Sequence, residues 1–249
     1  MVLRTYGDVT MFARTYGDGP ARVLWLHGWA RRGEDFATCA RLAAEAGVAS
    51  LVLDLPGFGS SPPPARPGGA RHYAELVAPV LDQCAVRPVI VGHSFGGRVA
   101  TVLAASVPDR VGALVLCGVP LLRDTRAVPP PRGYRAVRWL HRRGVVSDAR
   151  LEAARQRYGS TDYRRASGVV RDVLVASVNE DYRDELSRLR LPVALVWGER
   201  DDVVAPSVAR RAADLIGPSA SVTILAGVGH LVPTEAPDEL VRALGTVVA

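Results

Sequence analysis

The feature that most limits how this chain can fold is a regular alternation of short apolar runs with helix-length amphipathic stretches. The runs lie at Val23–Leu26, Ser50–Leu53, Pro88–Val91, Ala113–Leu116, Val193–Trp197 and Ser221–Leu225. Most are rich in valine, isoleucine and leucine and lack polar alternation, which is typical of strands buried on both faces of a parallel sheet. Helical patterns separate the runs, near Glu34–Ala46, Arg71–Cys84, Phe95–Val107, Pro206–Ile216 and Ala236–Val247. Because strand and helix patterns alternate, the sequence predicts an α/β fold with a mostly parallel, doubly wound sheet.

The start of the chain predicts an antiparallel hairpin, with residues 2–5 and 9–16 flanking Gly7-Asp8. Apolar and polar residues alternate there, whereas a signal peptide needs a continuous apolar stretch before a small-residue cleavage site. No apolar run approaches the roughly 18 residues that span a bilayer. The 3 cysteines are widely spaced, which favours neither a disulfide framework nor a zinc site. We therefore expect a cytoplasmic protein without a membrane span.

The alternation stops between Pro120 and Leu189, where the sequence has no strand pattern. Helical stretches take its place near Tyr134–Arg142, Asp148–Tyr158, Tyr163–Ala176 and Asp181–Leu189. Ligands of open α/β sheets bind at the carboxyl ends of the strands, so a helical insertion after the sixth strand is predicted to act as a lid. The predicted division is a core of residues 1–119 and 190–249 with a lid of residues 120–189.

Charge is unevenly distributed, and every basic residue is arginine. The absence of lysine excludes Schiff-base chemistry and a Walker A phosphate loop. Residues 121–190 contain 16 arginines and 9 acidic residues, a net charge of +7, against −1 for the remainder. The lid could attract an anionic substrate or carrier, such as an acyl-carrier protein or a CoA ester. Alternatively, its arginines form a solvated helix face. No aromatic stripe or recognised module indicates nucleic-acid binding.

The strongest chemical signal is the pentapeptide Gly92-His93-Ser94-Phe95-Gly96. It follows a predicted buried strand and opens a helical pattern, which is the strand–turn–helix setting of a nucleophile elbow. Such a turn strains the backbone of Ser94 and needs glycine on either side for close packing. The helix N-terminus would supply N–H groups to a developing oxyanion, so Ser94 is the predicted nucleophile.

Three other loops at the same end of the sheet carry the residues that a serine nucleophile requires. Trp29 follows the strand at Val23–Leu26, and its backbone N–H could pair with the Phe95 N–H as an oxyanion hole. Either Asp201 or Asp202 could provide a carboxylate after the strand at Val193–Trp197, and Asp202 could instead cap the next helix.

The predicted base is His230, one of 5 histidines. It lies on a loop after the last predicted strand and completes the chain order serine, aspartate, histidine. A neutral imidazole can remove the serine proton near pH 7, and a carboxylate fixes its tautomer. His27 is expected to have a structural role, and the His93 ring is expected to point away from the site.

Together these motifs resemble the α/β-hydrolase superfamily over about residues 9–247. The segment Asp54-Leu55-Pro56-Gly57-Phe58-Gly59-Ser60 looks like the D-x-P-G-x-G-x-S turn of that family, and the motifs around Trp29, Ser94 and Asp201 match it in order and spacing. The resemblance favours Asp201 over Asp202 as the acid. It implies hydrolysis of an ester, thioester or similar acyl bond through an acyl-enzyme on Ser94, without a metal or organic cofactor.

The same residues leave two other functions open. Carbon–carbon bond hydrolases, perhydrolases and lyases use the same triad, and nothing in it excludes them. A non-catalytic ligand-binding module of this fold is a third possibility, although all three triad residue types are present. Because Ser94 occupies the nucleophile position, the resemblance argues against haloalkane dehalogenases and epoxide hydrolases, which carry aspartate there.

Overall fold

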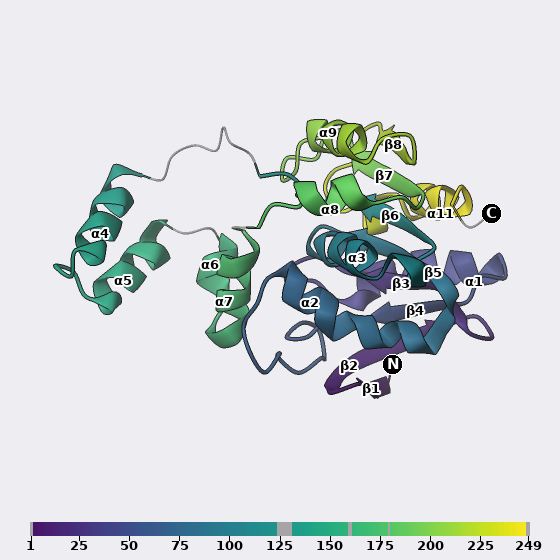
Figure 1. Ribbon diagram of the computed structural model, residues 1–249, viewed down its shortest axis with the longest axis horizontal. Coiled ribbons are helices and arrows are strands. Elements are labelled where there is room, and N and C mark those ends of the chain that lie inside the picture. The colour runs from purple at the N-terminus through teal and green to yellow at the C-terminus, as the bar shows by residue number, and fades with distance from the viewer. Residues whose placement is uncertain (1, 124–130, 159–160, 179, 248–249) are drawn as a thin grey trace.

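The computed structural model describes residues 2–123, 131–158, 161–178 and 180–247 (Figure 1). Within them, eight strands form one sheet in the order β1-β2-β4-β3-β5-β6-β7-β8. Their bounds are β1 Val2–Tyr6, β2 Val9–Tyr16, β3 Ala21–Leu26, β4 Ser50–Leu53, β5 Cys84–His93, β6 Ala113–Cys117, β7 Val193–Gly198 and β8 Ala220–Leu225. β1 and β2 form the predicted antiparallel hairpin, and β3 to β8 are parallel. The predicted α/β fold is confirmed.

Helices separate the parallel strands as predicted. Their bounds are α1 Ala37–Glu45, α2 Ala70–Val77, α3 Phe95–Ser106, α4 Arg132–Arg142, α5 Asp148–Tyr158, α6 Thr161–Arg165, α7 Gly168–Ser177, α8 Arg183–Arg188, α9 Ser207–Ile216, α10 Val232–Glu235 and α11 Pro237–Gly245. Short 3₁₀ segments lie at Gly33–Phe36, Ala78–Gln83 and Pro108–Arg110.

Several predicted helices are shorter or divided in the structure, and three of these differences have a local backbone reason. The helix predicted to reach residue 84 ends at Val77, because Pro79 has no N–H to continue it and a 3₁₀ segment follows. The helix predicted over Ala236–Val247 likewise begins at Pro237, because Ala236 has a non-helical backbone with φ of −144° and ψ of 57°. The helix predicted across Tyr163–Ala176 is divided at Gly168, whose φ of 52° begins α7.

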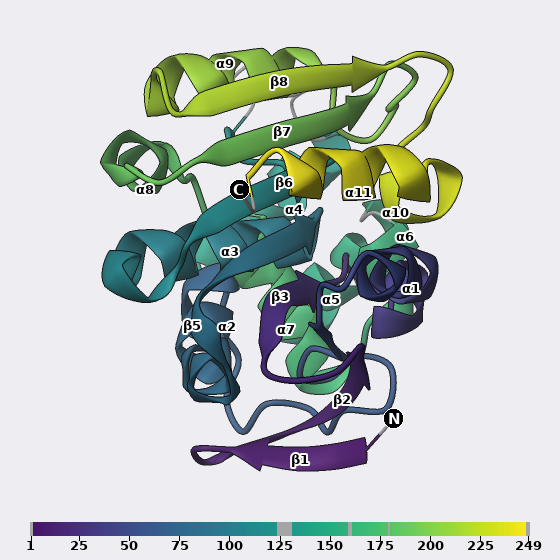
Figure 2. The ribbon, with the colours of Figure 1, turned by 90° about the vertical axis from the view of Figure 1, so that its right-hand side faces the viewer.

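The sheet has an apolar core on each face, because successive side chains of a strand point to opposite sides. In β3, Leu24 and Leu26 join the core beneath α2, α3, α8 and α9, whereas Val23 and Trp25 join the core beneath α1 and α11. Figure 2 shows α1 and α11 on one side of the sheet and α2 and α3 on the other. Burial on both faces explains why the strands are continuous apolar runs.

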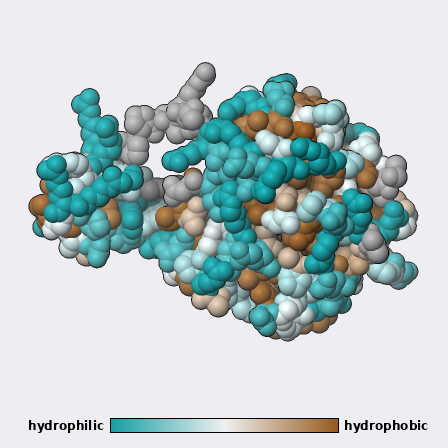
Figure 3. Space-filling view, viewed as in Figure 1, coloured by the Kyte–Doolittle hydropathy of each residue, from teal (hydrophilic) through white to brown (hydrophobic). Residues whose placement is uncertain are grey.

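The segment between β6 and β7 holds α4 to α8, which agrees with a helical insertion after the sixth strand. Residues 124–130, 159–160 and 179 of this segment lie outside the described part of the chain. α4 packs against α5 and projects from the sheet, and the surface of this pair is mostly hydrophilic (Figures 1 and 3). α8 packs instead on α3 and α9. The exact division into core and lid stays a prediction.

The end of the insertion is attached to α2 by polar contacts. Glu180 accepts a hydrogen bond of 2.8 Å from the N–H of Ala70, at the start of α2. Arg71 pairs with Glu185 at 2.6 Å, and Glu185 is 4% exposed. Because Glu185 is buried, loss of Arg71 would leave its charge without this partner, so these contacts help to hold the insertion where it rejoins the core.

None of the helices in the described ranges has the length and apolar character needed to cross a membrane.

The end of β7 makes a specific prediction about stability. A Cβ on Gly198 would lie 2.1 Å from the carbonyl oxygen of Gly229, so Gly198→Ala must displace the backbone. We expect a loss of about 1–3 kcal/mol, typical of overpacking. Gly245→Ala is the matched control, because a Cβ there meets nothing within 4 Å. Thermal unfolding should show a lower Tm for Gly198→Ala, by roughly 2–4 °C per kcal/mol. Equal Tm values for the two variants would contradict the close approach.

Candidate functional site

Ser94 occupies a strained turn between β5 and α3. Its φ of 48° and ψ of −112° lie where residues other than glycine are rarely found. Glycine at position 96 allows α3 to approach the strands closely, because a Cβ there would lie 2.1 Å from the carbonyl oxygen of Leu26. Ser94 is half-buried, between the buried residues His93 and Phe95. The strained backbone predicted for an elbow is therefore present, and it leaves Ser94 partly accessible.

Asp201 and His230 are brought together from the loops after β7 and β8. His230 Nδ1 lies 2.8 Å from Asp201 Oδ2, and the Asp201 side chain is fully buried. The other carboxylate oxygen accepts hydrogen bonds from the N–H groups of Val203 and Val204, at 2.9 and 2.8 Å. Asp202, the alternative left open by the sequence, is exposed.

The surroundings of Asp201 keep its carboxylate ionised. Burial raises the pKa of Asp201, but the hydrogen bond from His230 and those from Val204 and Val203 outweigh it, so the pKa lies below its usual value. An ionised carboxylate at Nδ1 holds the proton of a neutral imidazole on that nitrogen. The lone pair of His230 Nε2 is then free to accept a proton.

The Asp201–His230 pair lies close to the serine turn. The N–H of Ser94 donates to the carbonyl of Cys117 at 3.0 Å, and Cys117 precedes Gly118. A Cβ on Gly118 would lie 2.9 Å from His230 Cε1 and 3.3 Å from Asp201 Oδ2. No hydrogen bond joins the Ser94 hydroxyl to His230 within the described residues. The contact between nucleophile and base therefore stays a prediction, and such contacts often tighten only when substrate binds.

The two N–H groups predicted for an oxyanion hole come from adjoining loops. The N–H of Gly96 donates to the carbonyl of His27 at 3.0 Å, which fastens the loop after β3 to the start of α3. The Trp29 and Phe95 rings are 5.6 Å apart. Phe95 is the first residue of α3, where a helix offers its N–H no acceptor. The Trp29 N–H likewise has no acceptor among the described residues.

His27 has a position that agrees with a structural role. Its Nδ1 lies 2.8 Å from the carbonyl of Gly28, and its Nε2 accepts the N–H of Leu55 at 2.9 Å. Burial lowers the pKa of His27, so the ring is neutral with its proton on Nδ1. Asp54 accepts from Gly33 at 2.7 Å and from Ser60 at 2.8 Å. These bonds explain why aspartate and histidine are needed in the two turns.

Sequence reasoning missed the residues that hold the loop of His230. The His93 ring was expected to point away, but its Nε2 lies 3.0 Å from the carbonyl oxygen of His230, and the two rings are 4.9 Å apart. The Glu235 carboxylate accepts the N–H groups of Gly229 at 2.6 Å and Leu231 at 3.1 Å. No sequence signal identified either contact, because both depend on how distant loops pack.

His93 can act only as a neutral donor in this position. Burial and the nearby His230 lower its pKa to about 3. The ring nitrogen that faces the His230 carbonyl must carry the proton, because a carbonyl oxygen only accepts. His93 Nδ1 faces Gly28, where a Cβ would lie 2.7 Å away, so glycine at position 28 makes room for the ring.

The described residues include no group of three or more histidine, cysteine, aspartate or glutamate side chains placed to hold a metal ion.

The sequence profile of the alpha/beta hydrolase family matches residues 23–243 of this chain. A pimeloyl-acyl-carrier protein methyl ester esterase from Chromobacterium violaceum is 29% identical over 95% of this chain and 97% of its own length. A 2-hydroxy-6-oxononadienedioate/2-hydroxy-6-oxononatrienedioate hydrolase from Burkholderia vietnamiensis is 27% identical over 86% of this chain and 78% of its own.

Other relatives are longer than the matched region. The chain spans 62% of an acetyltransferase component of the acetoin cleaving system from Pseudomonas putida, at 28% identity. It matches 41% of the lipase LipV from Mycobacterium tuberculosis, at 42% identity over 43% of this chain.

Solved structures support the fold. An esterase from Thermogutta terrifontis superposes with a TM-score of 0.73 at 20% identity, covering 98% of this chain and 95% of that one. Est816, an N-acyl homoserine lactone degrading enzyme, gives a TM-score of 0.74 at 24% identity, covering 98% and 99%. Since the family profile covers most of the chain, this protein belongs to the alpha/beta hydrolase family and is an enzyme of that family.

Proposed function

We propose that this protein is a serine hydrolase that cleaves an ester, thioester or related acyl bond, with Ser94 as nucleophile, His230 as base and Asp201 as the acid that orients the base. The observation that carries the proposal is the 2.8 Å bond between His230 and the buried Asp201, beside a serine in a strained turn. This bond fixes the tautomer of His230 and leaves its Nε2 without a proton, as a base for Ser94 requires.

In the first half of the reaction, Ser94 Oγ attacks the acyl carbon while His230 Nε2 takes the hydroxyl proton. The carbonyl oxygen becomes an oxyanion that accepts hydrogen bonds from the N–H groups of Trp29 and Phe95. Collapse of this tetrahedral intermediate breaks the bond to the leaving group, which receives the proton from His230. An acyl-enzyme on Ser94 remains.

Water completes the reaction by the same route. His230 takes a proton from water, and the resulting hydroxide adds to the acyl carbon of the acyl-enzyme. Collapse of the second intermediate releases the acid, and His230 returns the proton to Ser94 Oγ. Asp201 stabilises the imidazolium at both stages without taking its proton.

The helical insertion is the proposed lid, since it follows β6 at the end of the sheet where Ser94 lies. The net charge of +7 over residues 121–190 supports a substrate that is anionic or attached to an anionic carrier. The Chromobacterium relative, whose name specifies a carrier-bound methyl ester, supports the same class.

Cleavage of a carbon–carbon bond is the second candidate, because the Burkholderia relative is named for hydrolysis of an oxo-dienoate compound. The proposed triad fits both reactions. Parallel assays with short p-nitrophenyl esters and with a vinylogous diketone decide between them.

The nucleophile is tested by covalent labelling. Wild-type protein should react with a fluorophosphonate probe, and Ser94→Ala should lose both labelling and at least about 10⁴-fold in kcat. Ser187→Ala is a matched control, because Ser187 lies exposed on α8 and its hydroxyl bonds only to the backbone of its own helix. Labelling that persists in Ser94→Ala would exclude Ser94 as the nucleophile.

The adjacent aspartates offer a direct comparison. Asp201→Asn keeps the size of the side chain but removes the charge that holds the His230 proton on Nδ1, so we expect kcat to fall by about 10³–10⁴-fold. Asp202→Asn changes the charge equally at an exposed position and should change kcat less than about 2-fold. Steady-state kinetics measures both, and similar losses in the two variants would exclude a specific role for Asp201.

His93 is expected to act as a positioning residue for the base. His93→Leu removes the donor to the His230 carbonyl and should lower kcat by about 10–100-fold with little change in KM, since small displacements of catalytic groups are costly. His93→Gln retains an N–H and should recover most of the loss. Because the pKa of His93 is about 3, neither variant should shift the acid limb of the kcat/KM profile above pH 5. Equal losses in both variants at unchanged Tm would contradict this role.

A further inference from the structure

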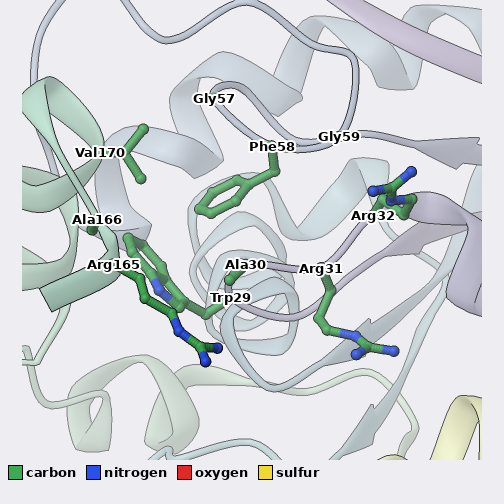
Figure 4. A pocket seen from close by; sticks show the side chains of 10 residues that line it. All are labelled: Trp29, Ala30, Arg31, Arg32, Gly57, Phe58, Gly59, Arg165, Ala166 and Val170. Atoms are coloured by element: carbon green, nitrogen blue, oxygen red, sulfur yellow. The ribbon is translucent and has the colours of Figure 1, made fainter. Parts of the chain in front are cut away.

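A pocket of about 310 Å³ opens beside Trp29, between the loop after β3, the loop after β4 and the start of α7. Figure 4 shows the rings of Trp29 and Phe58 within it, with Val170 on the side of the insertion. The volume lies at the lower end of the range for small-molecule sites. The apolar part of a small substrate could therefore be held against these side chains.

The pocket adjoins the loop after β3, which also lies against the serine turn. Trp29 lines it and carries one of the N–H groups of the proposed oxyanion hole. The preceding residue, Gly28, lies against the serine turn, since a Cβ there would lie 3.4 Å from Ser94 Cβ. A substrate whose carbonyl is held at Ser94 can extend past Trp29 into this pocket.

Charge in the pocket is of one sign. Its lining includes Arg31, Arg32 and Arg165 and no acidic residue. Arg31 is already neutralised by Asp35, at 2.5 and 2.9 Å. Arg32 and Arg165 are exposed, and neither side chain has a hydrogen bond or an ion pair among the described residues. Figure 4 shows Arg165 beside Trp29 and Arg32 on the far side of the pocket.

We propose that this pocket selects substrates with an anionic oxygen group at the end remote from the scissile bond, and that Arg165 and Arg32 bind that group. Two arginines with no acidic partner among the described residues are available to form charge-assisted hydrogen bonds to a carboxylate or phosphate. This inference rests on the proposed acyl hydrolase and adds a substrate class and two specificity residues. The proposed anion site differs from a general attraction of anionic substrates by the positively charged insertion, because it involves only 2 of the 31 arginines of the chain.

The test compares two esters that differ in one terminal charge, mono-p-nitrophenyl glutarate and p-nitrophenyl pentanoate. The measured quantity is the ratio of their kcat/KM values. Wild-type protein should prefer the glutarate ester, and Arg165→Gln and Arg32→Gln together should lower the ratio by about tenfold, as expected for loss of charged hydrogen bonds. Arg135→Gln and Arg138→Gln together are the matched control: both arginines are exposed on α4, the pair of substitutions removes the same two charges, and neither residue lines the pocket.

Binding gives a second measurement that does not need turnover. Titration of Ser94→Ala with free glutarate should quench tryptophan fluorescence, since Trp29 lines the pocket, and Arg165→Gln in that background should weaken the binding. Glutarate and inorganic phosphate are also tested as inhibitors of p-nitrophenyl pentanoate hydrolysis. This comparison distinguishes a site for a carboxylate from a site for a phosphate. Inhibition by either supports an anion site and identifies its chemistry, and inhibition by neither overturns it.

The outcomes separate this inference from the proposed function. If Ser94 is not labelled and neither ester is hydrolysed, the proposed function is contradicted, and the anionic pocket is contradicted with it. Normal labelling with no preference for the glutarate ester would overturn the anionic pocket alone. An equal fall of the ratio in the Arg135→Gln and Arg138→Gln double variant would also overturn it, because the preference would then come from the charge of the whole insertion.

Discussion

Close contact between α3 and the strands is the constraint on which the rest of the site depends. The N–H of Gly96 bonds to the His27 carbonyl, and a Cβ on Gly92 would lie 2.5 Å from the Cα of Gly97. This contact bends the chain sharply at Ser94 and gives its backbone a positive φ. It also brings the loop after β3 beside the start of α3. The strain at Ser94 is offset by the packing of α3 along its length on one of the two apolar cores of the sheet.

His230, the proposed base, is also held by several contacts, although its loop is partly exposed. Asp201 fixes the ring of His230 from one side, and His93 and Glu235 bind the backbone of its loop. His93 immediately precedes Ser94 in the chain, so a single buried imidazole connects the nucleophile turn directly to the loop of the base. Gly118 leaves space for the pair at the end of β6. Several short contacts, rather than one, therefore hold the loop of His230 beside the Ser94 turn.

The proposed selection of substrates involves a part of the molecule other than the proposed triad. The pocket beside Trp29 is formed jointly by the core loops and by the insertion, which contributes Arg165 and Val170. The insertion is attached to the core through Arg71 and Glu185, and its α4–α5 pair extends beyond the sheet. Because the proposed triad lies on loops of the core and the insertion contributes to the pocket, changes in the insertion can alter the pocket without moving the proposed triad.

The sequence by itself determined the sheet, the insertion after its sixth strand and the residues proposed for catalysis, because buried parallel strands and the elbow leave local signatures in apolar runs and glycines. It could not choose between Asp201 and Asp202 from the residues alone, since adjacent side chains differ only in where the loop directs them. It also placed the His93 ring wrongly and gave no sign of Glu235. Those choices depend on contacts between loops far apart in the chain, which exist only after the sheet has aligned the carboxyl ends of its strands.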